Sequence, residues 1–368
     1  MLKRQRWILF TGAGAALAIR VSHLLAHRGN FDTGVYERIV ALFRSGGNLY
    51  SGTNEYKWSP VWALLLWVIH GVGGALGWPL HRAVGFFLLG VDGVTAYLVY
   101  RIALRIGSRG ESGALGAAVL FFANPVSIFA SGFNLQWDNL SILFLLAALL
   151  FALPPEGRKT RFVASLSASI LIKHISWCHP ILLFQNRTLP GRWRRAALLP
   201  YAVFLVSFLP YWGAWNGIRE NVFGYRGGHE RYGLGVLMEV GWLPGWGATL
   251  IFLAAVVAAA LEFRNLEPVR ASLLLFLVML LFTPGIQQYY FVWPIALGSV
   301  FGGFGYAAYT VVTAAFLIHS PDGLQLDWRG LPDWNGPWWA AMLWLLLEVR
   351  NLRGRPAGQR LAGRATRV

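Results

Sequence analysis

Charged residues are scarce in this sequence, and so are the residues that build metal centres. Only 13% of the 368 residues are charged, about half the share found in soluble globular domains, which excludes a soluble multidomain protein. The single cysteine, Cys178, lies in an apolar stretch, so the chain has no disulfide framework and no cysteine cluster for a metal. His23, His27 and His70 are scattered without metal-ligand spacing. The glycine-rich residues 71–77 do not follow a strand pattern, so a nucleotide-phosphate loop is not indicated.

Acidic residues are particularly few, with 16 Asp and Glu against 32 Lys and Arg, for a net charge of +16. The basic residues stand in short clusters between apolar runs, as the positive-inside rule predicts for cytoplasmic loops. They do not gather on one soluble face, which argues against nucleic acid as a partner. The basic end, residues 350–368, is instead expected to contact anionic membrane lipids. An internal repeat, from which many transporters are built, is also missing.

Apolar runs of spanning length fill most of the chain, which is 56% hydrophobic. The first run, residues 7–27, resembles a signal peptide but continues past the cleavage-like site, so we interpret it as an uncleaved span. Placing every basic cluster in the cytoplasm predicts an all-α polytopic protein with about eleven or twelve transmembrane helices and both termini inside. The predicted spans cover residues 7–27, 83–104, 113–132, 138–153, 196–214, 243–262, 270–284, 287–302, 306–319 and 337–349, with a short hairpin over 162–172 and 176–186 and external loops over 28–59 and 215–242.

Residues 61–80 do not fit this path directly. They are apolar enough to span, but a full crossing would place the basic cluster of residues 101–109 outside. Gly71, Gly73 and Gly74 also interrupt the run, so we interpret it as a re-entrant or broken segment. On this interpretation residues 1–349 form one integral membrane domain, and residues 350–368 form a basic cytoplasmic tail.

The helix ends that this topology places outside the cytoplasm carry an unusual set of polar side chains. They come from the two external loops, the end of the 113–132 span and the start of the 287–302 span. Ionisable groups at membrane depth are costly and mark functional sites by default, so their convergence predicts a site roofed by loops. The residues are Asp32, Glu37, Tyr56, Lys57, Trp58, Gln136, Asp138, Arg226, His229, Arg231 and Gln288.

Each of these groups also has a structural interpretation. Asp32 precedes a regular helical run and is a candidate helix N-cap. Gln136 and Asp138 fit a solvated turn, and residues 219–231 fit a solvated loop. Asp92 lies mid-span and needs a buried partner or a proton, so we expect a structural role for it. An interfacial aromatic belt is the competing interpretation for Tyr289, Tyr290 and Trp293.

Six short blocks, in order along residues 28–295, resemble those of one enzyme superfamily. They are Phe31-Asp32-Thr33-Gly34-Val35-Tyr36, Gly47-Asn48-Leu49-Tyr50 followed by Tyr56-Lys57-Trp58-Ser59-Pro60, Asp92-Gly93-Val94-Thr95-Ala96-Tyr97-Leu98-Val99-Tyr100-Arg101, Asn124-Pro125 with Ser131-Gly132 and Asp138, Lys173 with Pro180, and Gln288-Tyr289-Tyr290-Phe291-Val292-Trp293. Together they resemble the GT-C membrane glycosyltransferases, most closely the GPI mannosyltransferase I catalytic-subunit family and bacterial polyprenyl-phosphate-mannose-dependent mannosyltransferases. The chain departs from the family pattern at Asn30, where the first-loop motif usually has a first acid, and at residues 133–136.

The resemblance implies an inverting glycosyltransferase of a bacterial-type plasma membrane with an extracytoplasmic active site. It would move a hexose, mannose favoured, from a polyprenyl-phosphate sugar to a hydroxyl of a lipid-linked or glycan acceptor. The catalytic acid of the family carries over onto Asp32, as the general base. The candidates for binding the donor phosphate are Arg226, Arg231, His229, Lys57 and Lys173. The candidates for binding the sugar or the acceptor are Tyr56, Trp58, Gln136, Asp138 and Gln288.

Two further functions stay open at this point. One is a polytopic transporter or accessory subunit for lipid-linked glycans, without catalytic activity. The other is a nucleotide-sugar transferase, which should keep its polar groups on the cytoplasmic side. No cofactor is implied and no clear metal site is present, although Asp32 and Glu37 could bind a divalent ion weakly.

Overall fold

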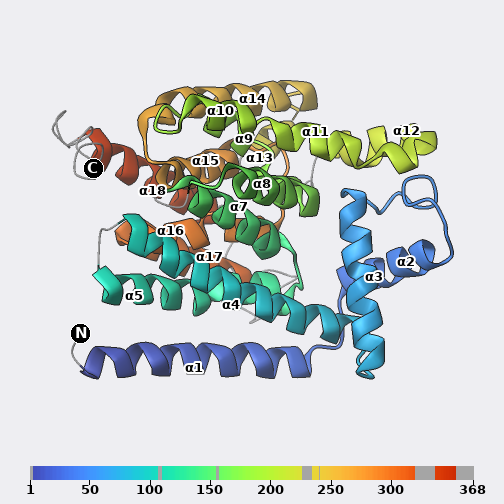
Figure 1. Ribbon diagram of the computed structural model, residues 1–368, viewed down its shortest axis with the longest axis horizontal. Coiled ribbons are helices and arrows are strands. Elements are labelled where there is room, and N and C mark those ends of the chain that lie inside the picture. The colour runs from blue at the N-terminus through green and yellow to red at the C-terminus, as the bar shows by residue number, and fades with distance from the viewer. Residues whose placement is uncertain are drawn as a thin grey trace.

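The computed structural model describes residues 3–106, 110–154, 157–225, 234–239, 241–319 and 336–353, and these residues form helices joined by turns (Figure 1). The all-α prediction is therefore confirmed for the described part of the chain. The helices are α1 (Lys3–Ala26), α2 (Phe31–Arg44), α3 (Pro60–Ala75), α4 (Leu80–Ile106), α5 (Gly110–Phe122), α6 (Pro125–Ile128), α7 (Asp138–Ala152), α8 (Lys159–Ile172), α9 (His179–Gln185), α10 (Gly191–Ala196), α11 (Leu199–Val206), α12 (Trp215–Ile218), α13 (Leu234–Glu239), α14 (Gly245–Glu262), α15 (Pro268–Phe282), α16 (Ile295–Phe301), α17 (Phe304–His319) and α18 (Gly336–Arg353).

Several long apolar helices indicate an integral membrane protein. Among the described residues, three helices are long and apolar enough to cross a membrane, or five if each of two bent pairs is one span. Four more apolar helices, α3, α7, α15 and α17, have only 10–17 residues in the searched ranges, fewer than the roughly 20 that a span needs. The larger number of spans expected from the sequence stays a prediction.

The core of the bundle is formed around α15, which is apolar on all sides after Ser272 and is buried along most of its length. A helix of this kind needs neighbours in every direction, and α14, α16 and α18 supply them. At the periphery, α1 keeps an exposed apolar face that includes Trp7, Ile8 and Phe10, as expected for a helix that faces lipid. A second apolar cluster joins α2, α3 and one end of α4.

Residues 61–80 are broken, because α3 ends at Ala75 and α4 begins at Leu80, but the glycines do not make the break. Gly71, Gly73 and Gly74 lie inside the continuous helix α3, and the chain turns only after Ala75. Gly73 permits close packing on α4, because a Cβ atom there would lie 2.7 Å from the Cβ atom of Ala83. In Figure 1, α3 runs across the direction of α1 and α4 at one end of the bundle. Whether α3 enters the membrane stays a prediction.

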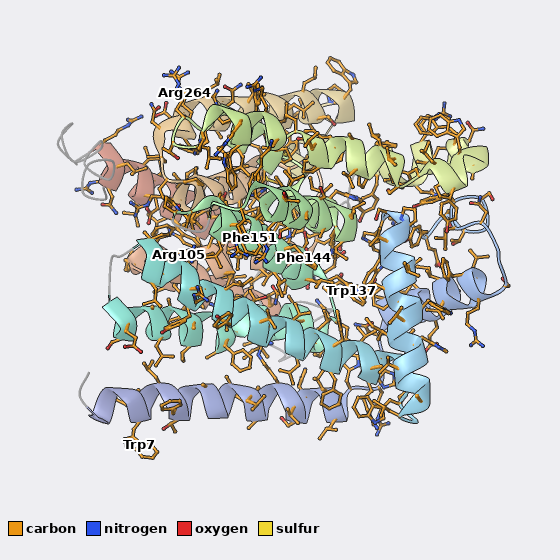
Figure 2. All side chains as sticks on the ribbon, viewed as in Figure 1. Trp7, Arg105, Trp137, Phe144, Phe151 and Arg264 are labelled. Carbon is orange, nitrogen blue, oxygen red and sulfur yellow. The ribbon has the colours of Figure 1, made fainter. Side chains whose placement is uncertain are left out.

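Two of the predicted cytoplasmic clusters lie at the opposite end of the bundle from Trp137 (Figure 2). Figure 2 shows Arg105 and Arg264, which belong to or adjoin the predicted cytoplasmic clusters, toward one end, and Trp137 toward the other, beside α3. The start of α1 and the end of α18 lie at the same end as Arg105 (Figure 1). Arg105 and Arg264 are thus separated from Trp137 and α3 along the helices (Figure 2). Which end faces the cytoplasm stays a prediction.

The segment that contains α12 packs against the first loop, residues 28–59. Gly217 of α12 lies against the backbone of Tyr50, where a Cβ atom would come within 1.8 Å of the carbonyl oxygen. Nearby, the side chain of Asn221 donates a hydrogen bond to the carbonyl of Thr53 at 3.2 Å. These contacts hold α12 against the first loop.

Candidate functional site

Asp32 lies in the first turn of α2, but it is not the residue that caps this helix. The cap is Asn30, whose side chain accepts a hydrogen bond from the Thr33 amide at 3.0 Å, while the Thr33 hydroxyl accepts one from the Asn30 amide at 2.8 Å. This reciprocal capping box leaves the Asp32 carboxylate free for other contacts. Asp32 accepts a hydrogen bond of 2.6 Å from the side-chain amide of Gln136, 104 residues later in the chain. The N-cap interpretation of Asp32 is therefore wrong.

The turn that carries Gln136 is held by the N-terminal part of the chain. The chain leaves the π-helical turn Phe129–Phe133 and turns back through Leu135, which has a positive φ of 52°, a conformation that non-glycine residues rarely adopt. Three successive carbonyls of this turn, at residues 133, 134 and 135, accept hydrogen bonds from His27, Asn30 and Tyr36 at 2.8, 3.2 and 3.3 Å. These contacts fix Gln136 beside Asp32.

A buried ion pair lies next to Gln136. The ammonium group of Lys173 is 2.5 Å from a carboxylate oxygen of Asp138 and 3.4 Å from the side-chain oxygen of Gln136. The second carboxylate oxygen of Asp138 accepts a hydrogen bond from the indole of Trp293 at 2.8 Å. Lys173 follows the end of α8 in an extended conformation, and its ammonium group lies 4.4 Å from the ring centroid of Tyr289. Asp138 is therefore a buried, fully paired group and not part of a solvated turn.

The aromatic residues near 290 belong to this cluster. Tyr290 stacks on Trp293 with ring centroids 4.5 Å apart, and Tyr289 and Trp293 contact the buried Lys173–Asp138 pair. The belt interpretation therefore does not describe Trp293, which is 4% exposed. Among the described residues, the cluster joins α2, the turn before α7, the break after α8 and the turn before α16.

The electrostatic surroundings of Asp32 combine partial burial with nearby cations. Burial raises the pKa of the Asp32 carboxyl above its usual range, while Lys173, the hydrogen bond from Gln136 and Lys57 each lower it. The effect of burial outweighs the others, so the carboxylate is a stronger base than an aspartate in water. Lys57 is half-buried, with its ammonium group 4.5 Å from the ring centroid of Tyr225.

The other predicted binding residues have different environments. Tyr56 is fully buried and helps to start α3, because its hydroxyl donates to the Ser59 carbonyl at 2.5 Å and accepts from the Ala63 amide at 3.0 Å. Trp58 is half-buried next to it, and Gln288 is buried in the turn Gln288–Val292.

Three predicted phosphate ligands, Arg226, His229 and Arg231, lie outside the described residues. Glu37 is exposed on α2. The described part of the chain contains no group of three or more His, Cys, Asp or Glu residues that could hold a metal ion.

The buried partner that Asp92 requires is Arg20 of α1. Both side chains are almost completely buried and form an ion pair, and Ser131 also donates to the Asp92 carboxylate. Arg20 was not among the residues that the sequence pointed to, yet a signal was present, since a lone arginine interrupts the apolar run 7–27 and a lone aspartate interrupts the run 83–104. The structural role expected for Asp92 agrees with this pairing.

Comparison of the chain with protein-family models, with curated proteins and with solved structures gives no match. The function is therefore inferred from the geometry of the site and from the six sequence blocks.

Proposed function

We propose that this protein is an inverting glycosyltransferase that moves a hexose, with mannose favoured, from a polyprenyl-phosphate sugar to an acceptor hydroxyl. The observation that carries the proposal is the placement of Asp32. It is a partly exposed carboxylate on a loop helix at the end of an apolar bundle, held by Gln136 and surrounded by two lysines. The family resemblance of the surrounding sequence blocks supports the choice of reaction.

The reaction needs a base, a leaving group and a means of stabilising it. The Asp32 carboxylate takes the proton of the acceptor hydroxyl, whose oxygen attacks the anomeric carbon of the donor sugar. The bond between that carbon and the phosphate oxygen breaks, and its electron pair leaves with the polyprenyl phosphate, so the configuration inverts. Lys57 is the better phosphate contact among the described residues, because the charge of Lys173 is already paired with Asp138.

The donor is tested by direct transfer. Purified protein in lipid vesicles is given either a polyprenyl-phosphate mannose or a nucleotide-linked mannose, together with a lipid acceptor extract, and labelled product is measured. We expect transfer from the polyprenyl-phosphate donor alone. Transfer from the nucleotide sugar alone would overturn the donor assignment, and transfer from neither donor would favour the non-catalytic transporter or accessory subunit.

The base is tested by Asp32→Asn, which keeps the acceptor for Gln136. We expect transfer to fall by at least about a hundredfold, the low end for loss of general base catalysis. The free energy of unfolding should not fall in this variant. The pKa of the Asp32 carboxyl is raised in the folded protein, so ionising this group costs stability as the pH rises from the unfolded-state pKa through the folded-state pKa. Asparagine carries no charge and removes that cost.

Glu55→Gln is the matched control. Glu55 is an acid of the same loop whose carboxylate pairs with Arg38 near the surface, where ion pairs contribute little. Near-normal transfer by Asp32→Asn would remove Asp32 from the mechanism.

A further inference from the structure

The break between α5 and α6 leaves a carbonyl that needs a donor. In a continuous helix the Phe122 carbonyl would accept from the amide of Val126, but that amide donates to the side chain of Asn124 at 2.9 Å instead. Arg20 of α1 supplies the missing donors, with its Nε and one Nη atom 3.1 and 3.0 Å from the Phe122 oxygen. Within an apolar bundle an unsatisfied carbonyl is costly, so Arg20 stabilises the break.

The same guanidinium group also holds the segment beyond the break. It donates to the hydroxyls of Ser127 and Ser131 at 3.1 and 3.0 Å and pairs with Asp92 of α4. The two serines lie one turn apart, Ser127 in α6 and Ser131 in the π-helical turn Phe129–Phe133. The position of this turn is therefore fixed by a charged pair that is almost fully buried.

The Arg20–Asp92 pair is also connected to the chain on the far side of the turn. The side-chain amide of Asn139 donates to the second carboxylate oxygen of Asp92 at 2.7 Å and to Ser127 at 3.1 Å. Asn139 directly follows Asp138. Residues 134–137, which carry Gln136, are thus anchored at both ends to one ion pair.

We propose that the buried Arg20–Asp92 pair is a positioning device, which holds the turn of residues 134–137 so that Gln136 meets the Asp32 carboxylate. The pair does not touch Asp32 itself, and its effect passes through the serines, Asn139 and the turn. The consequence for catalysis rests on the proposed function. The hydrogen bond between Gln136 and Asp32 does not depend on any reaction.

The test follows the protonation of Asp32 and not only activity. When the pair is removed, the turn keeps its contacts with His27, Asn30 and Tyr36 but loses its anchors on either side. Gln136 is then held less firmly, and the hydrogen bond that favours the charged carboxylate weakens. The midpoint at which Asp32 loses its proton should then move upward, by at most the shift of about one pH unit that corresponds to a whole hydrogen bond to a charged group. Infrared titration of the full chain in lipid vesicles reports this midpoint, with the Asp32 band assigned as the one that is lost in Asp32→Asn.

Two variants keep the test decisive. Arg20→Gln combined with Asp92→Asn removes both charges, so that neither is left buried alone, and Ser131→Ala removes one contact of the turn if the double variant does not fold. Asn186→Ala is the matched control, since it removes a buried side chain that donates to the Leu266 carbonyl at 3.0 Å, next to Arg264 at the opposite end of the bundle (Figure 2).

We expect the upward shift in the double variant and a smaller one in Ser131→Ala, with none in the control. The acidic limb of kcat/KM should move with the infrared midpoint. A folded double variant, or Ser131→Ala in its place, that titrates with the wild-type midpoint would overturn the inference. The proposed function fails separately, if the wild-type protein transfers no sugar while the infrared shifts are still observed.

Discussion

The Lys173–Asp138 ion pair offers a sharp test of how the site is built, because both partners are buried. The Asp138 side chain is 0% exposed and that of Lys173 is 8% exposed. Asp138→Asn keeps an oxygen for Trp293 but leaves the Lys173 charge without its counterion. Breaking a buried pair from one side costs about 3–5 kcal/mol, whereas removing both charges is often close to neutral.

The magnitude for this pair should fall at the lower end of that range. After Asp138→Asn, the Lys173 ammonium group still faces Tyr289 and the oxygen of Gln136, which offset part of the loss. We therefore expect Asp138→Asn to lower the free energy of unfolding by about 3 kcal/mol. The double variant Lys173→Met with Asp138→Asn should recover most of this loss.

Unfolding in mixed detergent and lipid micelles, followed by tryptophan fluorescence, gives the four corners of the cycle. Single and double variants whose losses simply add would refute the conclusion that the two groups interact as a buried pair.

Transfer should also fall less in Asp138→Asn than in Asp32→Asn, because Asp138 is expected to act through binding and support of the site. Equal losses of kcat would contradict this division of roles.

Three further predictions follow from single features. Gln136→Leu should move the acidic limb of kcat/KM upward by about one pH unit, since it removes a hydrogen bond that lowers the pKa of Asp32; a downward shift would contradict the geometry. Gly217→Ala should lower the free energy of unfolding by about 1–3 kcal/mol because its Cβ atom meets the first-loop backbone, whereas Gly213→Ala, with open space around it, should not; equal effects would refute close docking of α12. A reporter fused at Arg192 should be cytoplasmic, and an external reporter would reverse the proposed orientation.

The sequence by itself determined the class of protein. Low charge, long apolar runs and basic clusters between them predict a helical membrane protein, because these are local properties that each segment carries alone. The sequence also indicated that Asp92 needs a partner, since an isolated carboxylate is costly in an apolar helix. The blocks around Asp32 and Gln288 marked the end of the bundle where the polar groups gather.

Only the tertiary structure decided which of these groups meet. Asp32 and Gln136 are 104 residues apart, and Arg20 and Asp92 are 72 apart, so no local pattern pairs them. A break after α5, a π-helical turn and a positive φ at Leu135 direct Gln136 toward α2, and such irregular backbone leaves little trace in hydrophobic periodicity. The glycines of α3 show the same limit, because a glycine that breaks a helix and one that lets two helices pack closely look alike until the neighbouring helix is in place.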